Sequence, residues 1–218
     1  MTLDSATFGR FNDALGAVLS GAESAVTPTD RDMIATAVRL AAETSTTLAV
    51  RSAAPGSSVK APSNGVLISL DKFNAIEVRA ASLLARAGAG ASVATVQQRV
   101  ASEGLAVVGL GSGPLPATVG ALVAAGAVPR RSLAGVEAVL TTGELITFGG
   151  VLKDVVGYDV PALLLGSMGR LGIITEVTFR LEPAKARTTT PSGAPGAATL
   201  DPVLVRAFDP LQLLRPPA

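Results

Sequence analysis

Backbone amides, rather than reactive side chains, are the groups in this sequence best suited to chemistry. Small residues and glycine are concentrated in three segments, 51–58, 111–120 and 166–172. Such segments present several N–H groups toward one point, which lets them bind a phosphate or diphosphate without a positive side chain. The alternative is that the glycines only mark turns, because glycine is abundant throughout, at 23 of 218 residues.

Side-chain chemistry is restricted by what the chain lacks. There is no histidine and no cysteine, so the sequence predicts no zinc or copper site, no disulfide and no Ser–His or cysteine nucleophile. No residue is assigned a catalytic role and no metal is expected. The lack of cysteine is compatible with the reducing cytoplasm, where we expect the protein to reside.

Charge and aromatic content argue against nucleic acid as a partner. Lys and Arg total 18 against 17 Asp and Glu, without a basic block, and aromatic residues make up only 3% of the chain. A nucleic-acid surface needs clustered cations, and single-stranded binding also uses aromatic stacking platforms. Hydrophobic residues nevertheless reach 48%, which predicts an aliphatic core of Val, Leu, Ile and Ala.

Two common phosphate-binding motifs do not fit. Gly109, Gly111 and Gly113 give G-x-G-x-G, but a third glycine two positions on is wrong for a Rossmann fingerprint, and Pro114 follows where the helix should begin. There is also no G-x-x-x-x-G-K-[ST] sequence for a P-loop. A diphosphate site, if present, must be built from separate loops.

Longer motifs resemble a known family. Residues 149–161 and 166–175 carry K-x-x-x-G-Y-D followed by G-S-x-G-x-L-G-I-I-T, and residues 114–121 are similar to a P-x-A-T-V-G-G loop. In these motifs the chain resembles the FAD-linked oxidase family, in particular the FAD-binding subunits of glycolate oxidases. The resemblance covers about residues 26–183.

The resemblance implies an α+β fold of the PCMH type, in which two subdomains hold FAD between them against glycine-rich backbone. Carried over by position, Lys153 and Tyr158 could approach the cofactor, although a lone tyrosine beside a turn usually packs. The implied FAD-binding residues are Ser52, Ala53, Ala54, Pro55, Gly56, Ser57, Pro116, Ala117, Thr118, Val119, Gly120, Gly166, Ser167, Gly169, Gly172 and Ile173. Without His or Cys as anchors, FAD is expected to be bound non-covalently.

Departures from the family pattern leave two functions open. Where the family has three glycines, this chain has Ser-Ala-Ala at residues 52–54, and Ala121 stands in place of a fourth glycine. About eight residues that the family has before the position of Gly135 are missing. The C-terminal substrate domain of the family is also absent from the chain. One interpretation is an FAD-binding oxidoreductase module or subunit that takes electrons from a 2-hydroxy acid and works in a hetero-oligomer. The other is a non-catalytic relative that acts in assembly.

Hydrophobic periodicity predicts the elements that must position these loops. Helices are expected at residues 6–20, 92–103, 118–127 and 161–165. A further helix is expected to begin directly after Thr29, which would be its N-cap. Strands are expected at 47–51, 65–70, 76–80, 82–87, 105–108, 135–140, 144–148 and 171–181. The irregular alternation favours α+β over a doubly wound sheet.

Domain boundaries follow from the same pattern. Residues 1–25 are expected to form a helical segment without a signal peptide, 26–183 the FAD-binding domain, and 184–218 a disordered or loosely docked tail whose apolar residues could contact a partner subunit. Residues 104–129 contain no charge, but their glycines and prolines disfavour a membrane span. A buried strand, loop and helix is expected there.

Overall fold

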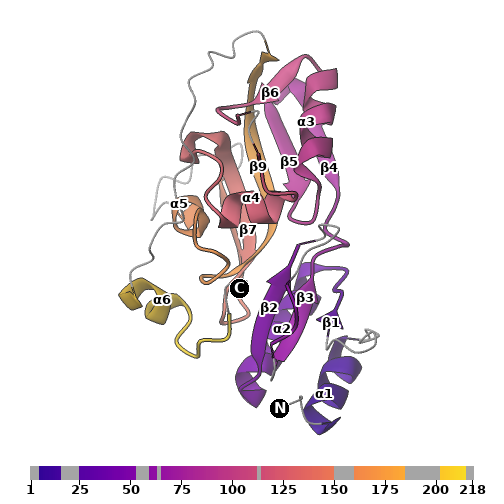
Figure 1. The fold of residues 1–218 in the computed structure, drawn as a ribbon, viewed down its shortest axis with the longest axis vertical. Coiled ribbons are helices and arrows are strands. Elements are labelled where there is room, and N and C mark those ends of the chain that lie inside the picture. Colours follow the sequence, from indigo (N-terminus) through magenta and orange to yellow (C-terminus); the bar gives the residue numbers. More distant parts are fainter. Residues whose placement is uncertain are drawn as a thin grey trace.

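A computed structural model describes most of the chain. The described residues are 5–15, 25–52, 59–62, 65–111, 114–149, 160–184 and 202–214. Two sheets stand one above the other, and the chain passes from the lower to the upper sheet after residue 70 (Figure 1). We call the part built on residues 5–70 the first lobe and that built on 71–184 the second lobe.

The first lobe is a small parallel sheet with the order β1 (Ala25–Val26), β3 (Gly65–Ser69), β2 (Thr47–Arg51). Helix α2 (Arg31–Thr44) lies between β1 and β2 in the chain, and α1 (Ser5–Leu15) packs beside it. The N-cap of α2 is Asp30, not Thr29 as the sequence suggested, because the Asp30 carboxylate accepts from the Met33 amide at 2.8 Å.

The second lobe is an antiparallel sheet with the order β4 (Ile76–Arg79), β5 (Leu84–Gly88), β9 (Ile173–Pro183), β7 (Leu133–Val139), β8 (Leu145–Gly149). The short strand β6 (Leu105–Val107) pairs with the end of β9. Two 3-10 turns, η1 (Ala80–Ser82) and η2 (Arg130–Ser132), precede β5 and β7. All of these strands lie within two residues of the ranges that alternation predicted.

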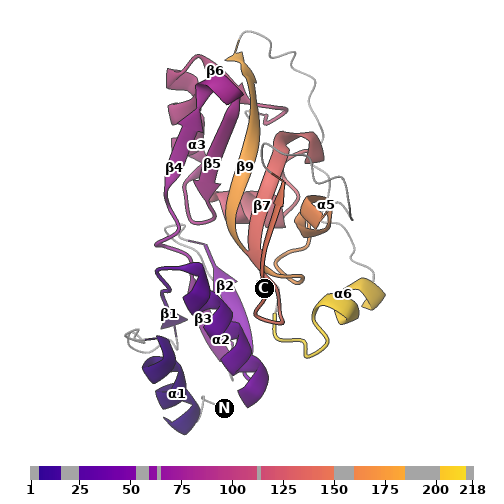
Figure 2. The ribbon, with the colours of Figure 1, turned by 180° about the vertical axis from the view of Figure 1, so that it is seen from behind.

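One face of this second sheet is covered by helices and the other is more open. Helices α3 (Val93–Ser102), α4 (Val119–Ala124) and α5 (Val160–Leu164) lie on the side seen in Figure 1, and the view from behind shows strands without these helices in front (Figures 1 and 2). Along β9, Val177 and Phe179 are buried, whereas Glu176, Thr178 and Arg180 alternate with them and face the open side.

The larger of two hydrophobic core clusters is mostly aliphatic and joins the lobes. It includes Phe11 and Leu15 of α1, so the N-terminal segment packs on the first lobe, and Phe179 at the centre of β9. Arg39 of α2 donates to the Gly143 carbonyl in the β7–β8 turn at 3.1 Å, which fixes α2 against the second lobe.

The C-terminal segment is docked onto both lobes, so of the two expectations for the tail, disordered or loosely docked, the docked one describes residues 202–214. Helix α6 (Pro202–Phe208) is followed by Leu213 and Leu214, which are buried. The Leu48 amide donates to the Leu213 carbonyl at 2.7 Å, and Leu214 forms a parallel bridge with Leu48. The Thr141 hydroxyl donates to the Phe208 carbonyl, so the segment spans from β2 to the β7–β8 turn.

Candidate cofactor site

Two of the sequence motifs, residues 114–121 and 166–175, meet the glycine-rich turn after β5 at Ala89, which is fully buried. Its amide donates to the Thr175 carbonyl of β9 at 2.9 Å, and its carbonyl accepts from the Gly120 amide of α4 at 2.7 Å. The glycine-rich turn after β5, the loop before α4 and the G-I-I-T strand are therefore held together by direct backbone contacts.

The carboxyl end of the first sheet reaches the same place. The Leu70 amide donates to the Arg51 carbonyl at 2.9 Å, and Gly90 lies so close to the Leu70 carbonyl that a Cβ there would collide with it. Ser52 follows β2 directly and is half-buried, while the predicted residues 53–57 fall outside the described residues. The segment predicted to bind diphosphate therefore begins at the junction of the lobes.

The loop before α4 differs in detail from the sequence interpretation. Thr118 is the N-cap of α4, and the Val119 and Gly120 amides donate to Ala91 and Ala89 rather than to open space. A Cβ on Gly120 would lie 3.0 Å from both the Cβ and the carbonyl oxygen of Ala89. A side chain here would force Ala89 to shift by a few tenths of an ångström, so packing within the protein favours glycine at this position. The amides of Ala117 and Thr118, in contrast, have no hydrogen-bond acceptor in the part of the chain that is described.

The G-S-x-G motif forms a tight turn at the other end of α4. Gly166 donates to the Val123 carbonyl at 3.0 Å, and Gly169 has φ +74° with open space around its missing Cβ. Gly172 packs against the Val139 carbonyl, and Ile173 begins β9 as a buried residue. Lys153 and Tyr158 lie outside the described residues.

Unpartnered polar groups indicate that this region suits an anionic group. Pro116 and Ala117 lead into α4 and are at least partly exposed. Among the described residues, three buried side-chain polar atoms have no hydrogen-bond partner, namely Ser69 Oγ, Ser167 Oγ and Arg170 Nε. Buried polar groups are normally satisfied, so these orphaned atoms call for a partner outside the described residues. With the two open amides before α4, they fit a phosphorylated cofactor.

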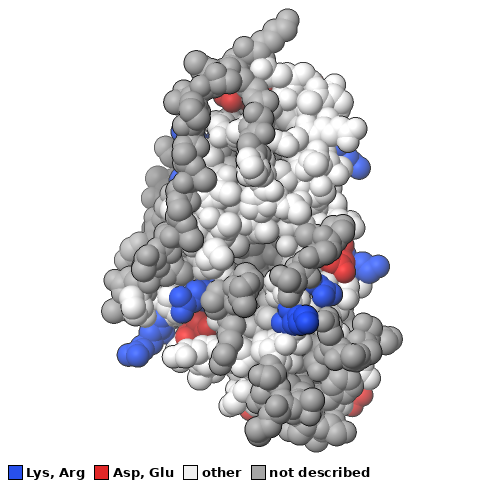
Figure 3. Space-filling view, viewed as in Figure 1, with Lys and Arg blue, Asp and Glu red and all other residues white. Residues whose placement is uncertain are grey.

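Surface charge is unevenly distributed on this side of the molecule. Figure 3 shows few charged side chains over the upper part of this face, while Lys and Arg lie farther down with Asp and Glu beside them. The face therefore shows no purely cationic patch in the part that is described.

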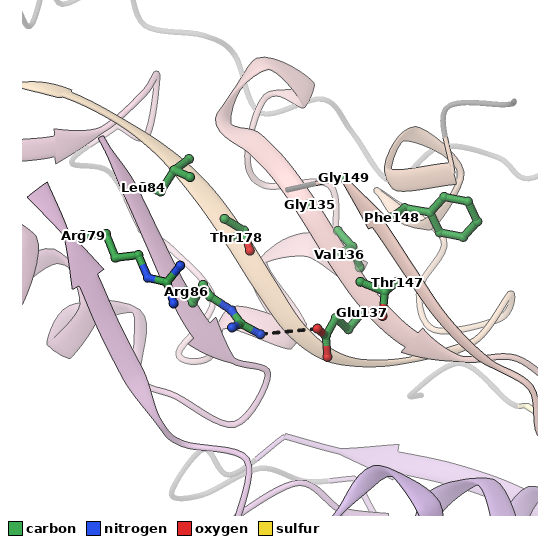
Figure 4. A pocket seen from close by; sticks show the side chains of 10 residues that line it. All are labelled: Arg79, Leu84, Arg86, Gly135, Val136, Glu137, Thr147, Phe148, Gly149 and Thr178. Atoms are coloured by element: carbon green, nitrogen blue, oxygen red, sulfur yellow. Dashed lines mark hydrogen bonds and ion pairs between the residues drawn. The ribbon is translucent and has the colours of Figure 1, made fainter. Parts of the chain in front are cut away.

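A cavity of about 250 Å³ lies elsewhere, on the open face of the second sheet (Figure 4). Its polar walls include Arg79, Arg86, Glu137, Thr147 and Thr178. None of the residues predicted for FAD lines it. Sequence reasoning missed this cavity, and the alternating charged residues on these strands are the signal that could have located it.

The arginines of this cavity are neutralised by carboxylates. Arg86 pairs with Glu137 at 3.4 Å and with Glu176, and Arg31 of α2 pairs with the same Glu137. Arg79 pairs with its neighbour on β4, Glu77, at 2.8 Å. The Arg79 hydrogen bond is the main cause of a lowered Glu77 pKa. With each cation paired, this cavity has no unpaired positive charge for an anion.

The arrangement defines an α+β domain of the PCMH type, in which two lobes flank a cofactor site. Residues 22–149 match the family described as FAD binding domain. The chain belongs to this family.

Characterised and uncharacterised flavoproteins are among its relatives. It is 31% identical over 172 residues to an FAD-linked oxidoreductase of Mycobacterium tuberculosis (73% of this chain, 37% of the relative) and 31% identical over 170 residues to the D-lactate dehydrogenase of Archaeoglobus fulgidus (72% and 38%). It is also 39% identical over 77 residues to glycolate oxidase subunit GlcE of Escherichia coli (31% and 22%). The cofactor of the domain is therefore FAD, and the domain is of the FAD-linked oxidoreductase kind.

A solved structure has the same fold. Phl p 4, a grass pollen allergen with glucose dehydrogenase activity, superposes with a TM-score of 0.61 at 21% identity, over 83% of this chain and 40% of that one. The chain spans less than two fifths of the length of the curated relatives named above. In the described ranges, no helix is long and apolar enough to cross a membrane.

Proposed function

We propose that this chain is the FAD-binding unit of an oxidoreductase that takes electrons from a small 2-hydroxy acid, such as lactate or glycolate, and passes them to a partner subunit. The observation that carries the proposal is the convergence at Ala89, where the motifs at 114–121 and 166–175 meet the turn at 88–90 and the end of the first sheet. Relatives with lactate and glycolate in their names support the substrate class.

In this proposal, residues 26–183 form the FAD-binding domain, with 1–25 as its N-terminal helical segment and 184–218 as its tail. Ser52–Ser57 and Pro116–Gly120 hold the cofactor from two sides, and Gly166, Ser167, Gly169, Gly172 and Ile173 close the site. The FAD would supply the hydride chemistry when bound. The chain itself contributes donors that bind and orient it, without a covalent anchor, and we place the protein in the cytoplasm.

A direct test is the flavin content of the purified chain. After incubation with excess FAD and gel filtration, we expect a flavin absorption spectrum, and acid precipitation should release all the flavin into the supernatant. Yellow colour that stays with the pellet would show covalent attachment. Absence of flavin after incubation would exclude the proposed function.

The need for a partner has its own test. A flavin dehydrogenase must hold its substrate against the flavin and remove a proton from it, and no described residue near the site is a histidine or a buried acid suited to this. We expect oxidation of 2-hydroxy acids, assayed with an artificial electron acceptor, only when co-expressed subunits co-purify with the chain. Robust turnover by the purified monomer would contradict this expectation.

A second function is favoured by one specific observation. The Val119 and Gly120 amides already donate to the carbonyls of Ala91 and Ala89, so they are not available to a phosphate. Alanine at 53, 54 and 121, where the family has glycine, adds methyl groups that limit how closely a phosphate can approach the backbone. A non-catalytic relative that serves in assembly would show this pattern. It would co-purify with its partner subunits whether or not FAD was present, which the flavin assay distinguishes.

A further inference from the structure

The C-terminal segment is attached to the two lobes at two points that lie close together in the chain. At one point the Leu48 amide of β2 donates to the Leu213 carbonyl at 2.7 Å, and Leu214 forms a parallel bridge with Leu48. At the other point the Thr141 hydroxyl, in the β7–β8 turn of the second lobe, donates to the Phe208 carbonyl. The segment therefore links the first sheet directly to the second.

Asp209 fixes the conformation of the chain between these two points. Its carboxylate oxygens accept from the Leu213 and Leu214 amides at 2.8 and 2.9 Å, and its carbonyl accepts from the Gln212 amide at 3.1 Å. Its own amide donates to the Val205 carbonyl of α6 at 2.7 Å. Gln212 has φ +52°, which residues other than glycine rarely adopt. One buried residue thus holds the whole turn, so both attachment points depend on Asp209.

In the first lobe, the attachment point lies on the strand that leads into the predicted cofactor loop. Strand β2 ends at Arg51, and Ser52 follows it directly. β2 is the outer strand of its sheet, because among the strands described there it pairs with β3 alone. The C-terminal segment covers this outer edge at Leu48. The contact with Leu213 therefore limits how far β2, and with it Ser52, can shift.

In the second lobe, the attachment point lies beside the start of β9. Thr141 follows the end of β7, where Val139 pairs with Ile173. A Cβ on Gly172 would lie 3.0 Å from the Val139 carbonyl oxygen, so the two backbones are in close contact. Gly172 and Ile173 are two of the residues predicted to close the cofactor site. The contact between Phe208 and Thr141 therefore attaches the segment next to this side of the predicted site.

We infer that Asp209 is a positioning residue for the FAD site: it holds the C-terminal segment across both lobes and so keeps Ser52 and Ile173 at the spacing that the cofactor needs. This inference rests on the proposed function. The docked segment contacts both lobes, and so does the proposed cofactor, so each favours the same relative placement of the lobes. Two binding events that favour one arrangement are coupled, and the coupling is reciprocal. Docking of the segment strengthens FAD binding by the factor by which FAD strengthens docking.

The test compares Asp209→Ala and Asp209→Asn with the wild type in the full chain. The matched variant is Arg206→Ala, which changes an exposed residue of α6. The affinity for FAD is measured by flavin fluorescence, and amide exchange at Leu48 is measured by NMR with and without saturating FAD. The melting temperature without ligand shows whether each variant is folded under the conditions of the assay.

A further measurement needs no cofactor. The chain contains no cysteine, so spin labels can be attached to one introduced cysteine in each lobe. Asp13→Cys in α1 and Gln98→Cys in α3 place the labels at exposed positions. The distribution of distances between the two labels reports the relative placement of the lobes. We expect a broader distribution in Asp209→Ala than in the wild type or in Arg206→Ala.

We expect Asp209→Ala to weaken FAD binding by about 5- to 50-fold, within the usual range of coupling between two sites. Asp209→Asn should lose less affinity, because its amide oxygen can still accept from one of the two backbone amides. In the wild type, saturating FAD should slow exchange at Leu48 by about the same factor, which a purely local role of the segment would not produce. Arg206→Ala should resemble the wild type in every measurement.

Several results would overturn the inference. One is faster exchange at Leu48 in Asp209→Ala with FAD affinity and label distances as in the wild type, because the segment would then only cover the exposed edge of β2. Another is a loss of FAD affinity without faster exchange at Leu48, or the same loss in Arg206→Ala. If Asp209→Ala does not fold, Asp209→Asn decides by the same criteria. Failure of the wild type to bind FAD would refute the proposed function, whereas the label distances would still show whether Asp209 holds the lobes in place.

Discussion

The docked C-terminal segment depends on one buried carboxylate. Asp209 is 1% exposed, and its two oxygens accept from the Leu213 and Leu214 amides at 2.8 and 2.9 Å. Replacing it by alanine leaves both amides without an acceptor. Hydrogen bonds to a charged group are worth about 1.5–3 kcal/mol each, and the change also removes the cost of burying a charge. From these two opposing effects we expect a net loss of about 2–4 kcal/mol.

A loss of this size should release the segment rather than unfold the protein. Ordering costs about 1–2 kcal/mol per residue, so the docking of residues 202–214 is stabilised only by the small excess of contact free energy over this entropy cost. When the segment leaves, the Leu48 amide loses its acceptor, the Leu213 carbonyl. Hydrogen exchange at Leu48 should then accelerate by about 30- to 1,000-fold in Asp209→Ala, at about 1.4 kcal/mol per tenfold.

The control is Arg206→Ala, which changes an exposed residue of the same segment. Amide exchange followed by NMR gives the rates at Leu48 and at residues of β9 in one experiment. The β9 amides should be unaffected, because the core of the second lobe does not depend on the segment. Unchanged exchange at Leu48 in Asp209→Ala, or the same acceleration in the control, would refute the reasoning.

Three further outcomes are expected. Gly120→Val should destabilise the fold by about 1–3 kcal/mol with or without FAD, because its Cβ meets Ala89; a variant that lost only FAD affinity would contradict this. Glu137→Gln, which weakens two ion pairs, should lower the melting temperature most at low salt. Glu77 has a lowered pKa in the folded state, because Arg79 donates a hydrogen bond to its carboxylate. Its contribution to stability is therefore present above its unfolded pKa and is lost as the pH falls through its folded pKa. In Arg79→Met, an NMR titration should show a higher Glu77 pKa than in the wild type.

The strands of the second lobe could be predicted because their signal is local. In β9, alternation of Val177 and Phe179 with polar residues gives both the strand and its buried face. The hairpin of β7 and β8 follows from Gly143, which has φ +77° in the turn between them. The sequence left open whether the tail is disordered or docked, and it could not show that Leu213 and Leu214 meet β2, because that contact joins segments far apart in the chain.

The glycines in the sequence indicated where the candidate site lies, but not which group approaches the backbone of each glycine. The sequence indicates close backbone approach at Gly120, and the structure shows that the approaching group is Ala89. At the turn 167–170, Gly166 and Gly169 marked a turn in the sequence, but the positive φ of Met168 could not be predicted, because methionine rarely adopts it. The orphaned atoms of Ser167 and Arg170 are a three-dimensional property, because burial and missing partners cannot be read from residue types.

The two faces of the second sheet make different kinds of contact. On the open face, Glu137 ties α2 to β7 through Arg31, and Arg39 ties α2 to the β7–β8 turn. On the helix-covered face, Ala89 joins the cofactor motifs without any charged side chain. The lobes also meet beside Ala89, where Gly90 packs against the Leu70 carbonyl. The relative placement of the two lobes is therefore held by contacts on both faces of the second sheet.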